Sequence, residues 1–213
     1  VSQQIFSNTS YSVIGRDVNG CVDTGFTNVQ VQRLLPGTIG PAQTVCEGSS
    51  FNAVQNTGSP SGGSGSFTYQ WQKSTDQLNW QDIPSAQQLN YSPGLQSATV
   101  YLRRKVTDSG VDTTTSLLAM IVNSRPNVRA NSSIRVVPPG ASITVTATGA
   151  NTYVWSATNS TAFTSVGAAS AAINSAPFTT TSYTVTGTNT ATSCQDTGVI
   201  QISVVPLIAG TIT

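Results

Sequence analysis

One stretch of the sequence occurs twice, and this repeat constrains the fold more than any other feature. The first copy reads TSYSVIG at residues 9–15, followed by CVDTG at 21–25. The second copy reads TSYTVTG at 181–187, followed by CQDTG at 194–198. The tyrosines are 183 − 11 = 172 positions apart and the cysteines 194 − 21 = 173, so the turn has gained one residue. The sequence therefore predicts a tandem array of similar units, and the window is expected to open in the middle of one.

Composition removes several classes of function. Charged residues make up 8% of the chain, against about 25% in typical globular domains, and the net charge is +1. This leaves no basic surface for nucleic acid, and no apolar run approaches the roughly 20 residues that span a bilayer. The sequence has no histidine, which is the commonest general base and metal ligand. We therefore expect neither an enzyme nor a membrane-inserted protein, and the abundant Ser, Thr, Asn and Gly favour an extracellular one.

Short alternating runs predict an all-β chain of two complete domains and part of a third. We expect residues 1–35 to be the C-terminal hairpin of a truncated repeat, 36–124 and 125–206 to be complete repeats, and 207–213 to start the next. About seven short strands in about 85 residues is typical of an immunoglobulin-like sandwich. A hairpin at 1–35 without a partner sheet should be disordered, be cleaved, or pair with another chain. Residues 168–177, which are rich in small side chains, are expected to be irregular.

Aromatic anchors align the two complete repeats. The string Tyr-Gln-Trp at 69–71 matches Tyr-Val-Trp at 153–155. Tyr101, late in the first complete repeat, is matched in the same way with Tyr183 in the second. Large aromatic residues at such positions are mostly buried. The predicted structural core therefore includes Trp71, Trp155, Tyr101 and Tyr183.

Candidate binding residues are few. Trp80 lies beside a turn on a predicted edge strand, and with Tyr91 it is the one aromatic pair we can offer as a polysaccharide contact. Calcium is the one cofactor worth naming, because it takes oxygen ligands. Its weak candidates are Asp17, Asn19, Asp108 and Asp112, but no complete calcium loop is present, and plain turns are favoured. The alternation also sends Arg104 to the face opposite Arg103 and Lys105, so these residues are not expected to bind phosphate.

The sequence resembles the repeats of very large cell-surface adhesins of gliding Bacteroidota, of the SprB type. In the first repeat the resemblance lies in VCEGS at 45–49, FTYQWQKSTD at 67–76, LNYSPGL at 89–95 and VYLRRKV at 100–106. In the second it lies in PGASITV at 139–145, TYVWS at 152–156 and TSYTVTG at 181–187. Such repeats look like Ig-like or PKD-like domains. The resemblance implies type IX secretion, attachment to the outer membrane, and a role in adhesion and gliding.

The cysteines depart from the pattern that this resemblance implies. Repeats of the family usually carry two cysteines that could close a disulfide within one domain, whereas each complete repeat here has one, Cys46 or Cys194. We therefore expect no disulfide within either repeat. A Cys46–Cys194 bond would have to reach between neighbouring repeats and is not expected either. Three cysteines are an odd number, so at least one, such as Cys21, must be free or pair outside the fragment.

The first hypothesis is that the chain is a structural repeat segment, which spaces adhesive regions and contacts its neighbouring repeats. Two further hypotheses remain open. The domains could themselves bind surface polysaccharide as carbohydrate-binding modules. They could also be accessory domains of a secreted enzyme. The location would be extracellular in each case, at the cell surface or secreted.

Overall fold

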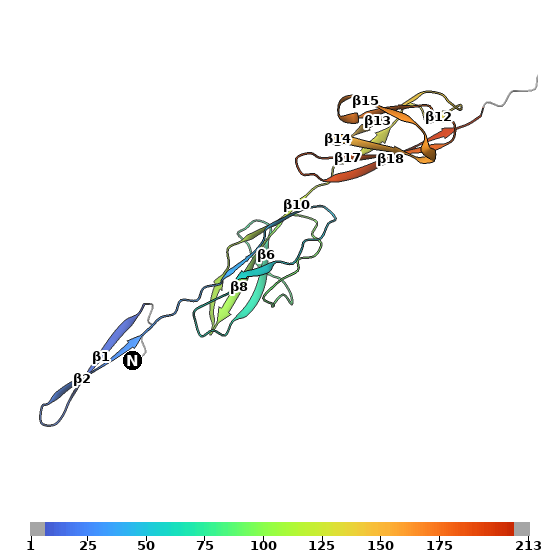
Figure 1. The fold of residues 1–213 in the computed structure, drawn as a ribbon. Helices are drawn as coiled ribbons and strands as arrows, with labels where there is room; N and C mark the ends of the chain where they lie inside the picture. The colour runs from blue at the N-terminus through green and yellow to red at the C-terminus, as the bar shows by residue number, and fades with distance from the viewer. Residues whose placement is uncertain (1–6, 207–213) are drawn as a thin grey trace, which may run out of the picture. The chain divides into compact units, whose positions relative to one another are not determined.

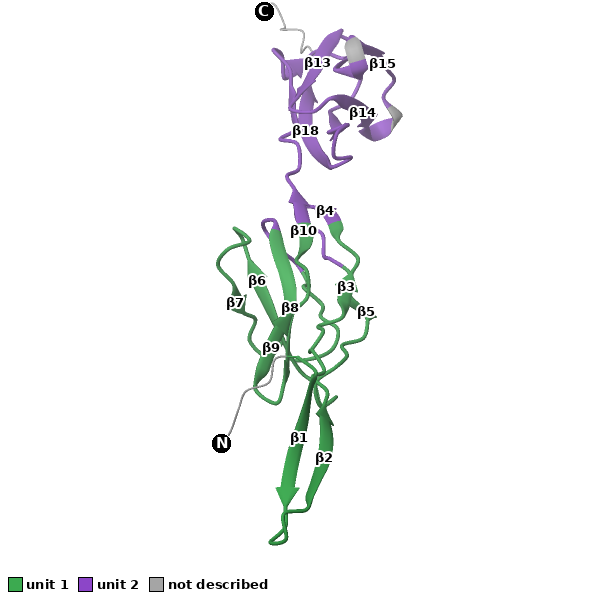
Figure 2. Cartoon of the chain, turned by 90° about the vertical axis from the view of Figure 1, so that its left-hand side faces the viewer, with its two compact units in different colours: residues 1–43, 52–94, 100–120 green, residues 44–51, 95–99, 121–213 purple. Residues whose placement is uncertain are grey.

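The computed structural model describes residues 7–206, in which the chain folds into β-strands and two short 3₁₀ turns. The chain forms two compact units, coloured separately in Figure 2. Unit 1 contains residues 1–43, 52–94 and 100–120, and unit 2 contains residues 44–51, 95–99 and 121–213. The predicted start of a next repeat at 207–213 lies outside the described residues. No helix within residues 7–206 is long and apolar enough to cross a membrane.

Unit 1 begins with a hairpin of two antiparallel strands, β1 (Thr9–Arg16) and β2 (Val22–Val29), drawn in blue in Figure 1. Asp17 shapes the turn because its Oδ1 accepts the backbone N–H groups of Asn19 and Cys21, at 2.9 and 2.8 Å. In the described part of the chain, β1 and β2 pair only with each other. Most of their side chains are exposed, and Thr9 and Tyr11 are half-buried.

The remaining strands of the first half of the chain form a six-stranded sheet and a two-stranded sheet. The larger sheet has the order β4-β10-β8-β6-β7, with β9 also paired to β8, and the smaller pairs β3 with β5. The strands are β3 (Thr38–Gly40), β4 (Gln43–Cys46), β5 (Gln55–Gly58), β6 (Thr68–Ser74), β7 (Gln81–Asp82), β8 (Val100–Asp108), β9 (Val111–Thr114) and β10 (Leu118–Asn123).

The core of unit 1 follows the period of two that strands impose on side chains. Along β8, every second residue from Val100 to Asp108 is buried and the residues between are half-buried. Trp71 on β6, Leu102 and Val106 on β8, and Val54 are each at most 1% exposed. These side chains fill the sandwich interior, which is the largest source of stability in such a fold.

Unit 2 contains two four-stranded sheets. One has the order β11-β13-β16-β15 and the other β12-β18-β17-β14, and all pairings are antiparallel except that of β12 with β18. The strands are β11 (Arg129–Asn131), β12 (Val136–Val137), β13 (Ile143–Thr148), β14 (Thr152–Ala157), β15 (Phe163–Val166), β16 (Ala172–Ser175), β17 (Thr181–Thr188) and β18 (Gln195–Val204), and the 3₁₀ turns are η1 (Thr158–Ser160) and η2 (Ala168–Ser170).

Both sheets of unit 2 contribute side chains to one core. Val145 and Ile173 come from the first sheet, and Tyr183, Val185 and Ile202 from the second, and none is exposed. The fold is an immunoglobulin-like β-sandwich, as the spacing of strands and turns predicts.

The prediction of an irregular segment at 168–177 is wrong in part. Residues 172–175 form β16, which lies between β13 and β15 in its sheet. Ile173 is the one large apolar residue of this strand and is fully buried. Because ladder hydrogen bonds on both sides hold the strand, small side chains suffice at the other positions.

Candidate functional site

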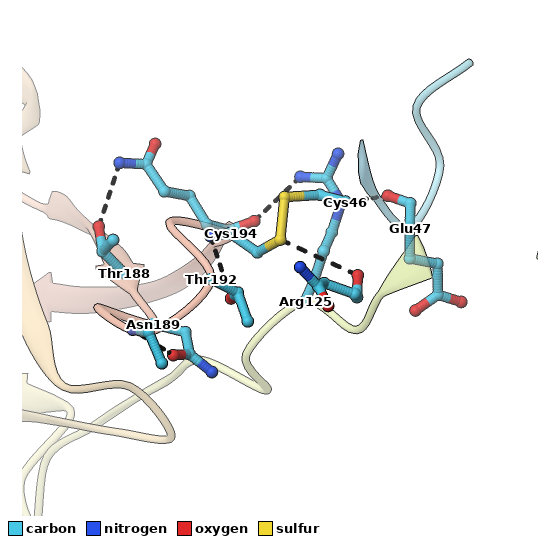
Figure 3. Close-up of a disulfide and its surroundings, with 10 residues drawn as sticks. Cys46, Glu47, Arg125, Thr188, Asn189, Thr192 and Cys194 are labelled. Atoms are coloured by element: carbon cyan, nitrogen blue, oxygen red, sulfur yellow. Dashed lines mark hydrogen bonds between the residues drawn. A yellow bond between two sulfur atoms is a disulfide. The ribbon is translucent and has the colours of Figure 1, made fainter. Parts of the chain in front are cut away.

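A disulfide between Cys46 and Cys194 is the most distinctive chemical feature of the chain. Cys46 is the last residue of β4, and Cys194 directly precedes β18. The two Cα atoms are 5.6 Å apart, which is a usual separation for a disulfide. Both residues belong to unit 2, and Figure 3 shows the yellow bond between their sulfur atoms.

The expectation that Cys46 and Cys194 do not pair is therefore wrong. It rested on their assignment to different, neighbouring repeats. In the structure, residues 44–51 belong to the same compact unit as the turn that carries Cys194. Folding brings the two cysteines together although their local sequences give no sign of it.

Arg125 holds the segments on both sides of the disulfide (Figure 3). Its Nε donates to the backbone carbonyl of Glu47 at 2.7 Å, and its Nη1 donates to that of Gln195 at 2.9 Å. Glu47 and Gln195 directly follow the two cysteines. The backbone N–H of Glu47 also donates to the carbonyl of Asn123, at 2.8 Å. The planar, multiply donating guanidinium suits such a bridge, because one side chain can satisfy two carbonyls.

The disulfide and Arg125 together form what we call the clamp: Cys46, Glu47, Arg125, Cys194 and Gln195. A cross-link stabilises a fold mainly by restricting the unfolded chain, and more so for long loops. Disulfides also persist mainly in oxidising compartments. The chemistry of the clamp is therefore structural cross-linking. Arg125 was missed in the sequence, and the only signal for the cysteine pair was that adjacent predicted repeats each hold one cysteine.

Asp108 organises the Gly/Ser-rich loop of unit 1. It is buried, at 3% exposure, and its carboxylate accepts hydrogen bonds from the backbone N–H and hydroxyl of Ser64, from the N–H of Gly65 and from the hydroxyl of Ser109. These bonds, those of Ser64 foremost, hold the pKa of Asp108 below its ordinary value. A cavity of about 630 Å³ is lined by Asp108, Gly63 and residues 31–34.

The weak calcium candidates lie in three places with partners of their own. Asp17 accepts hydrogen bonds within its own turn, and Asn19 is exposed in the same turn. Asp112 accepts a hydrogen bond from Thr107, which lowers its pKa, and forms an ion pair with Lys105 at 3.6 Å. Among the described residues, no group of three or more His, Cys, Asp or Glu side chains could hold a metal ion. That Asp17, Asn19, Asp108 and Asp112 belong to plain turns, with calcium binding as the weaker alternative, stays a prediction.

The two aromatic residues offered as a polysaccharide contact have different neighbours. The ring of Trp80 carries the guanidinium of Arg103 above it, 4.2 Å from the ring centroid, and its Nε1 donates to the carbonyl of Gln77. Tyr91 stacks on Trp71 with the centroids 5.4 Å apart, and burial raises the pKa of its hydroxyl. Trp80 and Tyr91 are both half-buried. Polysaccharide binding through them stays a prediction.

The four predicted core anchors lie as follows. Trp71 and Tyr183 are fully buried and Trp155 is 8% exposed. The core prediction for Tyr101 is wrong, because the buried face of β8 carries Leu102 and Arg104, and Tyr101 is half-buried on the opposite face. The buried polar atoms find partners, because both indole N–H groups donate to backbone carbonyls and the Tyr183 hydroxyl donates to Ser175.

Arg104 has a structural rather than a phosphate-binding setting. It is fully buried, and its two terminal nitrogens donate to the carbonyls of Leu89 and Pro36 at 2.9 and 3.0 Å. Burial lowers the pKa of Arg104. Its guanidinium also lies over the ring of Tyr69, 5.0 Å from the centroid, so this charge holds loops around the core of unit 1.

One family model matches part of the chain. Residues 35–124 match a family described as a domain of unknown function, DUF8696. No curated protein matches the chain.

The following three solved structures are similar to this chain and distant from it in sequence. PcdhgB3 EC1-4 aligns over 93% of this chain and 65% of its own length, at 8% identity and a TM-score of 0.40. The N-terminal four Ig domains of Dscam1 align over 92% and 54%, at 10% identity and a TM-score of 0.37. The fibronectin(III)-like modules of Clostridium thermocellum CbhA align over 85% and 100%, at 9% identity and a TM-score of 0.30. At these values the similarities carry no argument about function.

Proposed function

We propose that this chain is a spacer segment under tension in a large extracellular adhesin. It would comprise the C-terminal hairpin of one Ig-like repeat at 1–35 and two complete repeats at 36–124 and 125–206. The segment acts by linking and spacing adhesive regions, and it performs no chemistry of its own. The internal repeat and the sandwich fold support this proposal, and the disulfide supports an oxidising, extracellular location.

The clamp is the observation that carries the proposal. It ties Cys46, inside the family match at 35–124, to Cys194, which lies beyond it. A pulling force applied to the two ends of the chain passes through the sulfur–sulfur bond and bypasses residues 47–193. Those residues can lose their fold, but they cannot lengthen the molecule. Limited extension is what a spacer under tension requires.

The finer identity rests on the resemblance in sequence. We propose that the parent protein belongs with the gliding-motility adhesins of the SprB type, is exported by the type IX secretion system and is displayed at the outer membrane. An antibody against this fragment would test that placement in native cells. A very large protein that protease removes from intact cells supports it, and a small secreted species contradicts it.

Single-molecule stretching tests the mechanical role directly. The full chain is held by its two ends and pulled, first oxidised and then with a reductant. We expect unfolding of the reduced chain to release about 500 Å of extra length, since 148 residues each add about 3.4 Å. The oxidised chain should not release this length. Equal extension in both conditions would contradict the proposal, and Cys194→Ser should behave as the reduced chain does without any reductant.

A further inference from the structure

The two hairpins of the chain, β1–β2 and β17–β18, match in register pair by pair. Thr9 lies opposite Val29 as Thr181 lies opposite Ile202, and Gly15 lies opposite Asp23 as Gly187 lies opposite Asp196. All eight residue pairs of each hairpin correspond in this way. The two hairpins are therefore equivalent in structure as well as in amino-acid sequence.

The turns of the two hairpins also correspond. In one, the backbone N–H of Asp17 donates to the carbonyl of Cys21 at 3.0 Å, and in the other that of Asn189 donates to Cys194 at 2.9 Å. The side chains of Asp17 and Asn189 each accept the N–H two residues further on. Each cysteine directly precedes the second strand of its hairpin. Cys21 thus occupies the position that Cys194 occupies in unit 2.

Gly15 of the first hairpin points to a missing neighbour. A methyl group at Gly187 would lie 2.6 Å from a Val128 side-chain atom, and one at Gly198 would lie 2.9 Å from the backbone of Ala130, so the approach of residues 128–130 requires both glycines. A methyl group at Gly15 would meet nothing within 4 Å. The glycine is thus kept where no neighbour demands it within the described residues.

The exposed apolar residues of the first hairpin also point to a missing neighbour. Val13 is 70% exposed, whereas its counterpart Val185 is fully buried. In unit 2, β14 and β12 pair with the outer edges of the hairpin, and a second sheet contributes to the core that covers its inner face. The surface of β1–β2 therefore fits a sandwich half of the kind that residues 128–175 form.

We infer that Cys21 is a disulfide site whose partner is a cysteine on a β4-like strand, two repeats N-terminal to Cys46 in the parent polypeptide. The inference deepens the proposed function, on which it rests, because it makes the clamp a repeated joint. The separation of 148 residues between Cys46 and Cys194 places that partner about 148 residues before Cys21.

The bond forms by thiol–disulfide exchange. The two cysteine thiols become one sulfur–sulfur bond, and a thiol oxidoreductase of the oxidising compartment accepts the two electrons and two protons as its own disulfide is reduced to two thiols. Cys21 is exposed and has no partner among the described residues, so it is accessible to this exchange.

Peptide mapping of the native full-length protein tests the inference. Free thiols are blocked during extraction, and the protein is digested with trypsin without reduction. Cleavage after Arg16 and Arg33 releases Cys21 in the peptide 17–33. We expect this peptide to be linked to one from the preceding repeats. Recovery of 17–33 with a blocked thiol, linked to a second copy of itself, or linked to glutathione would overturn the inference.

The peptides that carry Cys46 and Cys194 are the internal control. If they are linked and 17–33 is not, the inference about Cys21 fails while the proposed function stands. If both Cys46 and Cys194 are recovered with blocked thiols, the clamp is absent and the proposed function loses its support. The sequence upstream of residue 1 gives a second readout, since a cysteine must stand about 148 residues before Cys21.

Discussion

The hairpins β1–β2 and β17–β18 have the same register and similarly hydrogen-bonded turns, which differ by one residue, but they have opposite environments. Every second residue of β17 is buried, and the corresponding residues of β1 are half-buried or exposed. The difference comes from the neighbours, because β17–β18 is flanked by β14 and β12 while β1–β2 pairs only with itself in the described chain. Local sequence thus suffices to set strand pairing and turn geometry, whereas burial depends on which other strands are present.

Replacement of the equivalent cysteines should give the largest difference between the hairpins in the free energy of unfolding. For a loop of 148 residues, the chain-entropy account predicts that Cys194→Ser lowers the free energy of unfolding by about 5 kcal/mol. The equivalent change Cys21→Ser should leave that quantity unchanged in this chain, because Cys21 is exposed and unbonded. Denaturant unfolding without reductant measures both. A similar loss for the two variants would break the comparison.

Truncation of the equivalent tyrosines should give the next largest difference. Tyr183→Ala removes a fully buried ring and its hydrogen bond to Ser175, so we expect a loss of about 4 kcal/mol. Tyr11→Ala removes a half-buried ring and should cost less than about 1 kcal/mol. Thermal unfolding of the two variants beside the parent chain measures this. A large loss from Tyr11→Ala would mean that the first hairpin is packed more tightly than its exposure indicates.

The equivalent glycines should give the smallest difference. Gly187→Ala places a methyl group against side-chain atoms of Val128 and Ala150, and overpacking of this kind costs about 1–3 kcal/mol. Gly15→Ala meets no atom within 4 Å and should be close to neutral in this chain. In a longer protein that completes the first sandwich, Gly15→Ala should instead become as costly as Gly187→Ala. Calorimetry of both proteins would sharpen the comparison, and a neutral Gly15→Ala in the longer protein would contradict it.

The parts of the structure that sequence predicts are those with a local cause. Alternation along 100–108 correctly places Arg104 and Arg103 on opposite faces, because side chains in a strand alternate whatever surrounds them. The repeat likewise predicts both hairpins. Neither feature requires knowledge of distant contacts.

The features that sequence did not predict depend on distant contacts. β16 has few large side chains and is defined by pairing with β13 and β15. The disulfide partner of Cys46 and the bond of Arg125 to Glu47 depend on the folding of residues 44–51 into unit 2. The position of Trp80 beside a turn on a predicted edge strand suggests a binding residue, but only the fold reveals that Arg103 lies over its ring.

The disulfide also changes what a break in the backbone does to this molecule. Seven of its nine Lys and Arg residues lie between Cys46 and Cys194. An enzyme that cleaves after basic residues would therefore make most of its cuts between these two cysteines. A single cut there turns one chain into two pieces that remain bonded through sulfur. A region attached at the N-terminal end therefore stays linked to a region attached at the C-terminal end, although the polypeptide between Cys46 and Cys194 has been cut.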